Sequence, residues 1–151
     1  MGELVPIEEE LRVVRTYLYI EKERFGKRLN ITWDVDSCEQ MKIPFLTIQP
    51  IVENAVRHGV LQRIEGGTIH IKVKDYEEYI EVSVVDDGVG MDQETQEGLF
   101  LKHPNRDKGI GVLNTDRRLK RYYGKGLQVK SELDVGTDIS FIVYKENKAS
   151  E

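Results

Sequence analysis

Hydrophobic residues at the start of the chain recur every three, four or seven positions, which is the spacing of one face of an α-helix. The recurring positions are Leu4, Ile7, Leu11, Val14, Leu18 and Phe25. They predict a helix over residues 6–25, whose apolar seam is interrupted once by Glu21 and which ends at Gly26. So short a seam favours a helix that packs on its own domain, with a dimerising coiled coil as the alternative.

The pattern then changes from a helical period to a strand period and back. Ile31, Trp33 and Val35 alternate with polar residues, as in a half-buried β-strand. Pro44 predicts the start of a second helix, which Pro50 would kink. The buried stripe of that helix is expected to consist of Phe45, Ile48, Val52 and Ala55.

Two alternating segments follow, over residues 68–75 and 79–86, and their short connection predicts an antiparallel hairpin. Residues 91–108 show no period. Long connections without a period are often functional, and we interpret this stretch as a mobile lid.

The remaining elements are a helix over residues 112–123 and two strands over residues 127–132 and 137–144, separated by a turn. All the elements together predict an α/β two-layer sandwich, in which helices cover one face of a mixed, mostly antiparallel sheet. The length of 151 residues suits a single domain.

Composition narrows the class of protein. The net charge of −5 argues against a nucleic-acid-binding surface, and the longest apolar-leaning stretch, residues 43–52, is far shorter than a membrane span of roughly 20 residues. A single cysteine, Cys38, rules out an internal disulfide and fits a reducing compartment. We therefore expect a cytoplasmic domain without membrane or nucleic-acid contact, and the opening Met1-Gly2 suggests a fragment of a longer protein.

The clearest candidate for chemistry is the end of the strand over residues 79–86, where alternation places Asp86 on the face of the apolar side chains. Burying a carboxylate costs several kcal/mol unless hydrogen bonds satisfy it. Gly88 and Gly90 follow, and backbone without Cβ atoms can bend sharply and approach a flat partner. We interpret this turn as an adenine-type pocket.

A second candidate is one arc of the second helix, opposite its apolar stripe. The arc carries Glu53, Asn54, Arg57 and His58, which supply a carboxylate, an amide oxygen and two donor groups. Such a set suits a hydrated Mg²⁺ that keeps substrate phosphates among its ligands. Taken alone, the arc favours an ordinary solvated helix face over a metal site.

A third candidate is the run Lys108-Gly109-Ile110-Gly111, which directly precedes the helix that begins at Val112. Free backbone N–H groups and the positive end of a helix dipole suit an anion, so the run predicts a phosphate site. A flexible hinge is the alternative.

Thr137 has the same inward parity on its strand as Asp86 has on its own. A hydroxyl and a carboxylate would then share one face of the sheet at strand ends. Either group alone could be a buried polar group whose hydrogen bonds are satisfied within the protein. The two together beside a glycine turn favour a ligand-binding site.

In this order, four segments resemble the N box and the three glycine boxes of the GHKL (Bergerat-fold) ATPases. They are residues 53–59, 86–90, 109–114 and 136–137. Within that group the chain resembles the catalytic ATP-binding domain of LytS-type sensor histidine kinases. Further support comes from residues 8–11, 17–25, 43–50, 117–119 and 123–124.

The resemblance implies that ATP and Mg²⁺ are the cofactors. Asn54 would ligate Mg²⁺, Glu53 would be catalytic by orienting or activating the reacting group, and Arg57 and His58 would contact phosphates. Such catalysis consists mainly of positioning and charge neutralisation.

The resemblance also assigns the nucleotide pocket. Asp86 would accept from the adenine amino group, Gly88 and Gly90 would shape the pocket, and Thr137 would support it. The phosphate side of the lid would be formed by Gly109 and Gly111, and the nucleotide-binding set also includes Met91, Lys108, Ile110 and Val112.

The same resemblance implies partners outside this chain. The acceptor histidine of the subfamily lies in a Pro-His-Phe context, which this sequence lacks. We therefore expect residues 1–25 to link to a dimerisation and phosphoacceptor domain, residues 26–146 to form the ATP-binding domain and residues 147–151 to be a tail. The parent would be a membrane-anchored bacterial sensor that passes phosphate to a response regulator.

Three other functions share these boxes. They are an ATP-hydrolysing clamp of the gyrase or mismatch-repair type, a serine-phosphorylating anti-sigma factor kinase, and a non-catalytic ATP-binding module. The pattern of the first helix argues against the serine kinase, and the polar residue retained in every box argues against the non-catalytic module.

Overall fold

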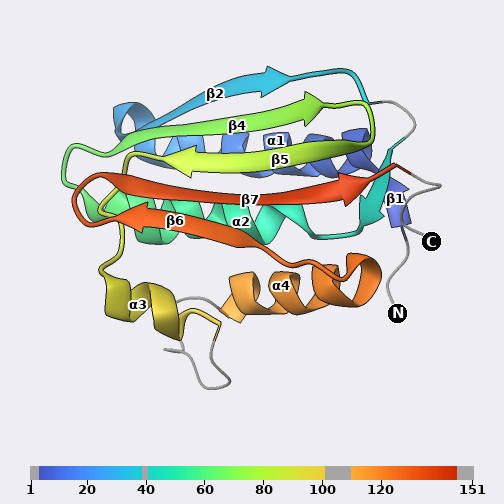
Figure 1. Ribbon diagram of the computed structural model, residues 1–151. Helices are drawn as coiled ribbons and strands as arrows, with labels where there is room; N and C mark the ends of the chain where they lie inside the picture. The colour runs from blue at the N-terminus through green and yellow to red at the C-terminus, as the bar shows by residue number, and fades with distance from the viewer. Residues whose placement is uncertain (1–3, 39–40, 101–109, 146–151) are drawn as a thin grey trace.

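One five-stranded sheet forms the front layer of the molecule (Figure 1). The computed structural model describes residues 4–38, 41–100 and 110–145. Across the sheet the strands are β2 (Leu29–Val35), β4 (Gly67–Asp75), β5 (Tyr79–Asp86), β7 (Gly136–Tyr144) and β6 (Gln128–Glu132). β2 pairs with β4 in parallel, and the other neighbours are antiparallel. The mixed, mostly antiparallel sheet and the 68–86 hairpin are thereby confirmed.

Helices form a second layer behind the sheet, on one face, and the helix over residues 93–98 lies below the β6 edge in this view (Figure 1). They are α1 (Ile7–Phe25), α2 (Ile48–Asn54), α3 (Gln93–Gly98) and α4 (Ile110–Tyr123). α2 continues without a break into a π-helical turn, Ala55–Gly59, and a short 3₁₀ turn, Val60–Gln62. The predicted two-layer sandwich is confirmed. None of the helices in the described ranges has the length and apolar character that crossing a bilayer requires.

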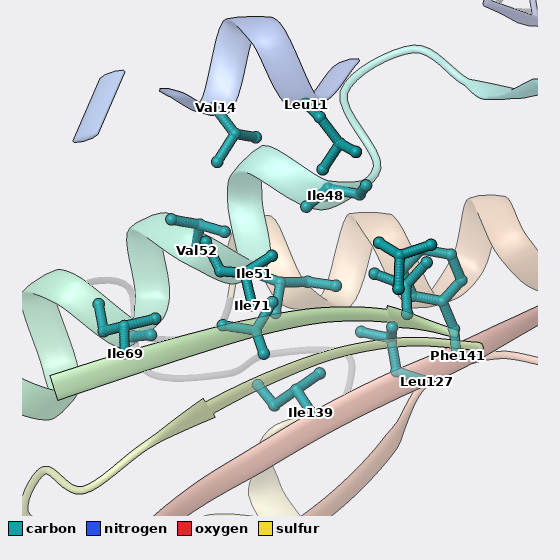
Figure 2. Close-up of a cluster of buried hydrophobic side chains, with 14 of the residues drawn as sticks. Leu11, Val14, Ile48, Ile51, Val52, Ile69, Ile71, Leu127, Ile139 and Phe141 are labelled. Atoms are coloured by element: carbon teal, nitrogen blue, oxygen red, sulfur yellow. The ribbon is translucent and has the colours of Figure 1, made fainter. Parts of the chain in front are cut away.

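The core lies between the sheet and the two helices behind it, as Figure 2 shows. The labelled side chains are Leu11 and Val14 from α1, Ile48, Ile51 and Val52 from α2, Ile69 and Ile71 from β4, Leu127, and Ile139 and Phe141 from β7. Burying one such side chain contributes roughly 1.5–3 kcal/mol. The predicted seam of α1 is therefore a face of this core, while Leu4 lies in strand β1 (Leu4–Pro6) and is half exposed.

The prediction of a helix starting at Pro44 is wrong. Pro44 ends strand β3 (Lys42–Pro44), which pairs antiparallel with β1, and Phe45 is 44% exposed instead of lining a buried stripe. α2 begins only at Ile48, so Pro50 lies in its first turn, where a missing N–H costs nothing, and the expected kink has no cause.

A buried carboxylate ties α1 to the start of α2. Glu10 has no exposed surface, and its two oxygens accept from the backbone N–H groups of Leu46, Ile48 and Gln49 at 2.9, 3.0 and 3.2 Å. These N–H groups include orphan donors of the α2 N-terminus. From the other side, Arg118 of α4 donates to the carbonyls of Phe45 and Leu46, both at 2.9 Å.

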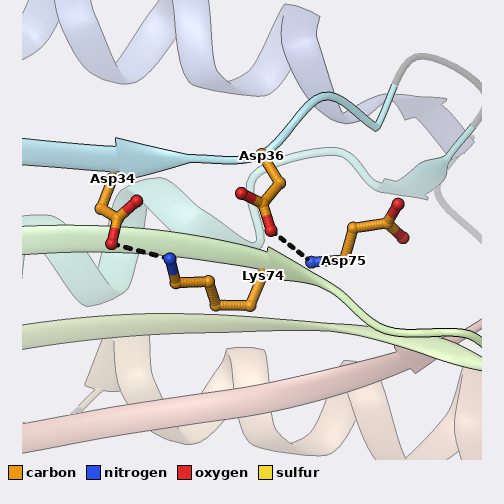
Figure 3. A network of polar contacts seen from close by, with 4 residues as sticks. All are labelled: Asp34, Asp36, Lys74 and Asp75. Atoms are coloured by element: carbon orange, nitrogen blue, oxygen red, sulfur yellow. Dashed lines mark hydrogen bonds and ion pairs between the residues drawn. The ribbon is translucent and has the colours of Figure 1, made fainter.

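At the opposite end of the sheet from Asp86, polar side chains join β2 to β4 (Figure 3). The Lys74 ammonium lies 2.7 Å from Asp34, and the backbone N–H of Asp75 donates to Asp36 at 2.9 Å. The ion pair is substantially exposed, so it contributes little stability. This end of the sheet is held mainly by its ladder and core.

Candidate nucleotide-binding site

A cavity of about 290 Å³ lies where β5 and β7 meet the turns that follow α2. Its lining brings together six of the predicted site residues: Asn54, His58, Asp86, Gly90, Met91 and Thr137. The other lining residues are Gly59, Gln62, Val89, Asp92, Thr95, Leu99 and Leu133. Residues from three of the four motif segments therefore line one cavity.

The Asp86 carboxylate is the buried charge of this cavity. Its side chain is 5% exposed, and Oδ1 accepts from the backbone N–H of Gly88 at 2.8 Å. Burial raises the pKa of Asp86 to about 6, and hydrogen bonds from the backbone of Gly88 and Thr137 oppose that rise. Near neutral pH the group is a carboxylate that accepts hydrogen bonds.

Glycine backbone encloses this carboxylate on several sides. A Cβ on Gly59 would lie 2.8 Å from Asp86 Oδ1, and a Cβ on Gly88 would lie 2.1 Å from the carbonyl carbon of Gly59. Gly90 has a φ of +68°, and a Cβ there would lie 2.0 Å from the Glu132 carbonyl oxygen. These glycines therefore permit backbone to pack directly on backbone, and the approach of a flat ligand stays a prediction.

Thr137 is directly opposite Asp86 in the β5–β7 register, and it is buried on the same face. Its hydroxyl forms a 2.8 Å hydrogen bond with the hydroxyl of Ser131, which also accepts from the Met91 backbone N–H at 2.8 Å. Gln96 donates to the Met91 and Ser131 carbonyls at 3.1 and 3.0 Å. The Thr137 hydroxyl is therefore held at the cavity by a network that includes the start of the 91–108 segment.

The polar residues of α2 and the π turn divide between two sides. Asn54 and His58 line the cavity, whereas Glu53 and Arg57 do not. Glu53 accepts from Gln49 at 2.9 Å, and both Glu53 and Arg57 lie within electrostatic reach of Tyr17 on α1. Residues four apart share a helix face, which groups Glu53 with Arg57 and Asn54 with His58. The four side chains therefore lie on two faces and not on the single arc that we expected.

The segment interpreted as a lid is partly described. Residues 93–98 form helix α3, which no period in the sequence indicates and which Asp92 caps by accepting from the Thr95 N–H at 2.8 Å. Residues 101–109, with Lys108 and Gly109, lie outside the described residues. Movement of this segment stays a prediction.

The last predicted residues of the phosphate run lie in the first turn of α4. Gly111 is exposed, and a Cβ there would be in ordinary contact with Pro50 at 3.4 Å. Val112 is 1% exposed and belongs to the core, so only its backbone is available to a ligand.

A family comparison matches the region that contains these elements. Residues 42–147 match the model described as "Histidine kinase-, DNA gyrase B-, and HSP90-like ATPase". The chain belongs to this ATPase family.

Curated relatives of this ATPase domain include sensor kinases. The chain is 38% identical over 137 residues to the uncharacterized protein YwpD of Bacillus subtilis (strain 168), covering 89% of this chain and 48% of YwpD. It is 36% identical over 141 residues to sensor histidine kinase YpdA of Escherichia coli (strain K12), covering 93% of this chain and 25% of YpdA. Sensor protein LytS of Bacillus cereus is 31% identical over 148 residues, covering 95% of this chain and 25% of LytS. The chain thus spans about half of YwpD and a quarter of the two sensors.

Solved histidine kinase domains share the fold. The nucleotide-free catalytic domain of histidine kinase ThkA has a TM-score of 0.71 at 18% identity, covering 95% of this chain and 97% of that chain. Full-length ShkA in complex with AMPPNP has a TM-score of 0.71 at 23% identity, covering 95% of this chain and 32% of ShkA. ThkA in complex with the response regulator protein TrrA has a TM-score of 0.67 at 18% identity, covering 97% of this chain and 42% of that chain.

The cavity of this ATPase domain offers few protein ligands for a cation. Among residues 4–38, 41–100 and 110–145, no group of three or more His, Cys, Asp or Glu side chains is arranged to hold a metal. Asn54 supplies one amide oxygen at the cavity. Mg²⁺ commonly takes one or two protein oxygens and completes its shell with phosphates and water, so this donor set fits a metal that arrives with a nucleotide.

Several cavity residues were not predicted as site residues. Gly59 directly follows His58 in the first motif, and its position there was the available signal. Leu99 and Leu133 reach the cavity from a helix end and a turn, and no local pattern marks such residues. These apolar side chains give the cavity the mixed lining expected of a ligand site.

Proposed function

We propose that this chain is the ATP-binding catalytic domain of a sensor histidine kinase, which binds Mg²⁺-ATP and transfers its γ-phosphate to a histidine on a dimerisation domain. The observation that carries the proposal is the cavity in which Asp86 and Thr137 meet Asn54 and His58. Membership of the ATPase family and the sensor kinases among its relatives support the reading.

In this proposal the base end of the cavity binds adenine. The Asp86 carboxylate accepts a hydrogen bond from the 6-amino group, because a buried acceptor selects a donor. Gly88 and Gly90 let this turn pack closely against the backbone of Gly59 and Glu132 and would thereby shape the pocket, and the Thr137 hydroxyl would support it.

The helix end of the cavity is assigned to the phosphates and their metal. Asn54 would contribute its amide oxygen to Mg²⁺, and the metal would supply charge neutralisation at the phosphate oxygens. His58 lines the same cavity and is assigned to phosphate contact, with Arg57 and the backbone of Lys108, Gly109, Ile110, Gly111 and Val112 as further phosphate contacts.

Glu53 has the catalytic assignment because residues 53–59 resemble the N box; it does not line the base cavity and, like Arg57, lies within electrostatic reach of Tyr17. It would orient the imidazole of an incoming acceptor histidine. The imidazole nitrogen forms a bond to the γ-phosphorus. The bond between that phosphorus and the oxygen bridging it to the β-phosphate breaks, and ADP leaves. Aligning the reacting groups is the main contribution of the chain.

We further propose that the acceptor lies on a dimerisation domain of the same kinase and that a response regulator receives the phosphate. ThkA, which shares this fold, has been solved with a response regulator protein. A membrane-anchored parent, a cytoplasmic position for this domain and the domain boundary at residue 25 belong to the same proposal.

The test uses γ-labelled ATP with the chain alone and with an added domain that carries a Pro-His-Phe acceptor. We expect ATP binding without stable self-labelling, and acid-labile phosphate on the added domain. Stoichiometric phosphohistidine on this chain alone would contradict the need for a separate acceptor. Acid-stable label would point to a serine kinase, and phosphate release without any label to an ATPase clamp.

A further inference from the structure

Arg63 donates hydrogen bonds to three backbone carbonyls at the base end of the cavity. Its Nε donates to the Asp87 carbonyl at 3.0 Å, and Nη2 donates to the carbonyls of Gly88 and Asp134 at 2.9 and 2.6 Å. Arg63 itself is half-buried, in the loop between the 3₁₀ turn and β4. One guanidinium therefore joins two turns that are far apart in the sequence.

Both turns carry groups of the adenine pocket. Gly88 supplies the N–H that binds Asp86 Oδ1 at 2.8 Å, and Asp134 lies in the turn that leads into Thr137. The Asp134 N–H donates to the Val89 carbonyl at 2.7 Å, which joins the two turns a second time. Asp134 has a φ of +66°, a left-handed conformation that a non-glycine residue keeps only when its surroundings hold it.

The position of Arg63 is itself fixed from outside the pocket. Arg28 Nη2 donates to the carbonyls of Leu61 and Arg63 at 2.9 and 3.2 Å. The loop that carries Arg63 is therefore anchored to the residue that precedes β2. An anchored donor can restrain the groups that it binds, whereas a mobile surface arginine cannot.

The charge of Arg63 also acts on Asp86. Burial and the neighbouring Asp87 raise the pKa of the Asp86 carboxyl, while the N–H groups of Gly88 and Thr137 and the Arg63 guanidinium lower it. His58 and Asp92 are the other ionisable groups that line the cavity with it. Arg63 thus favours the ionised, accepting form of Asp86.

We propose that Arg63 is a positioning residue that sets the Asp86–Gly88 turn, and so the selectivity of the pocket for a base with a 6-amino group. This inference rests on the proposed ATP-binding function and deepens it. The planar fork of arginine binds several carbonyls at once, which the single ammonium of lysine does not reproduce. The planar shape of the Arg63 side chain and its positive charge can therefore be tested separately.

The test compares the binding of ATP with that of purine riboside triphosphate, which lacks the 6-amino group, by calorimetry at pH 7.5. For the wild type we expect ATP to bind roughly tenfold more tightly, as one hydrogen bond to a charged group predicts. In Arg63→Gln, ATP affinity should fall roughly tenfold while the affinity for the analogue changes less than threefold. Discrimination between the two nucleotides should largely disappear.

Arg118→Gln is the matched control, because Arg118 also donates to two backbone carbonyls, those of Phe45 and Leu46, outside the cavity lining. It should lower thermal stability without changing discrimination. Arg63→Lys keeps the charge and loses the fork, so it should hold the pH midpoint of ATP binding near the wild-type value and still discriminate poorly. If Arg63→Gln does not fold, the discrimination measured for Arg63→Lys tests the proposal in its place.

Equal losses for both nucleotides in the Arg63 variants, or unchanged discrimination, would show that Arg63 only stabilises the fold and would overturn the inference. Failure of the wild type to bind ATP would be a different result. It would overturn the proposed function, and this inference with it.

Discussion

The two parts of the proposed nucleotide site, the base end of the cavity and the start of α4, are built in different ways. Around Asp86 the walls are backbone: Gly59, Gly88 and Gly90 all lie where a Cβ would overlap a neighbouring atom. At the start of α4, by contrast, a Cβ on Gly111 would make an ordinary 3.4 Å contact with Pro50. The backbone around Asp86 therefore admits no Cβ at these three positions, whereas the start of α4, a proposed phosphate contact, admits one at position 111.

This difference matches the tasks proposed for the two ends. A rigid base is selected by fixed donors and acceptors, and an unpaired buried charge strongly rejects the wrong base. Phosphates and a hydrated metal are bound by charge and by ligands that adjust. Substitutions at the two ends should therefore fail in different ways, and the following experiments test that expectation.

The largest effect is expected from Gly88→Ala. A Cβ there would lie 2.1 Å from the Gly59 carbonyl carbon, so backbone must move, and overpacking of this kind costs about 1–3 kcal/mol or more. Unfolding by urea should show the loss, and ATP binding should disappear. The control is Gly98→Ala in α3, where nothing lies within 4 Å, and it should be neutral or slightly stabilising. Equal tolerance of both changes would refute the crowded base end.

The next effect is the loss of base recognition in Asp86→Ala. A hydrogen bond to a charged group contributes about 1.5–3 kcal/mol, so ATP affinity should fall roughly ten- to a hundredfold. GTP should bind the wild type more weakly still, because its O6 would face a buried carboxylate. Calorimetry with both nucleotides measures the two effects. Comparable affinity for ATP and GTP would remove Asp86 as the reader of adenine.

The same carboxylate should lower the stability of the fold at neutral pH. Burial raises its pKa from 3.8 to about 6, so its folded form prefers the proton and stability falls as pH rises through that range. Asp86→Asn should therefore be more stable than the wild type by about 3 kcal/mol at pH 8, with the difference becoming small towards pH 4. Denaturation at several pH values checks the sign. Wild-type affinity for ATP should fall below pH 6 as Asp86 gains its proton.

The smallest effect is expected at the helix end, from Asn54→Ala. Binding of ATP should weaken about tenfold with Mg²⁺ present and change little without it, because Asn54 would act only through the metal. Titrations with and without Mg²⁺ measure the difference. Asn30→Ala, on the exposed start of β2, serves as the control. Losses of equal size in both conditions would mean that Asn54 only supports the helix.

Alternation in the sequence was enough to place the buried pair of the site. Asp86 and Thr137 both have the parity of apolar neighbours on their strands, and the structure puts them opposite each other in the register. A period of two fixes which face a side chain takes, and register follows when one face is buried. The 68–86 hairpin was predictable for the same reason, and the α1 seam was predictable from its helical period.

Features made by long-range hydrogen bonds were not predictable. Arg63 binds carbonyls 24 to 71 positions away, and Glu10 binds N–H groups at 36 to 39 positions. Neither residue stands out in a local pattern. The prediction from Pro44 was wrong because proline occurs both at helix starts and at strand ends. Here pairing with β1 places Pro44 at the end of a strand. The π turn also escaped prediction, and with it the division of Glu53 and Arg57 from Asn54 and His58.

The contact of Glu10 with the start of α2 also determines when certain amide hydrogens can exchange with solvent. The N–H groups of Ile48 and Gln49 are bonded to a side chain of α1, so separation of α1 from the start of α2 exposes them to exchange. Their exchange rates therefore report how often α1 separates from the helix that carries Asn54. Two amides thus provide a direct readout of whether motion of the first helix reaches the nucleotide site.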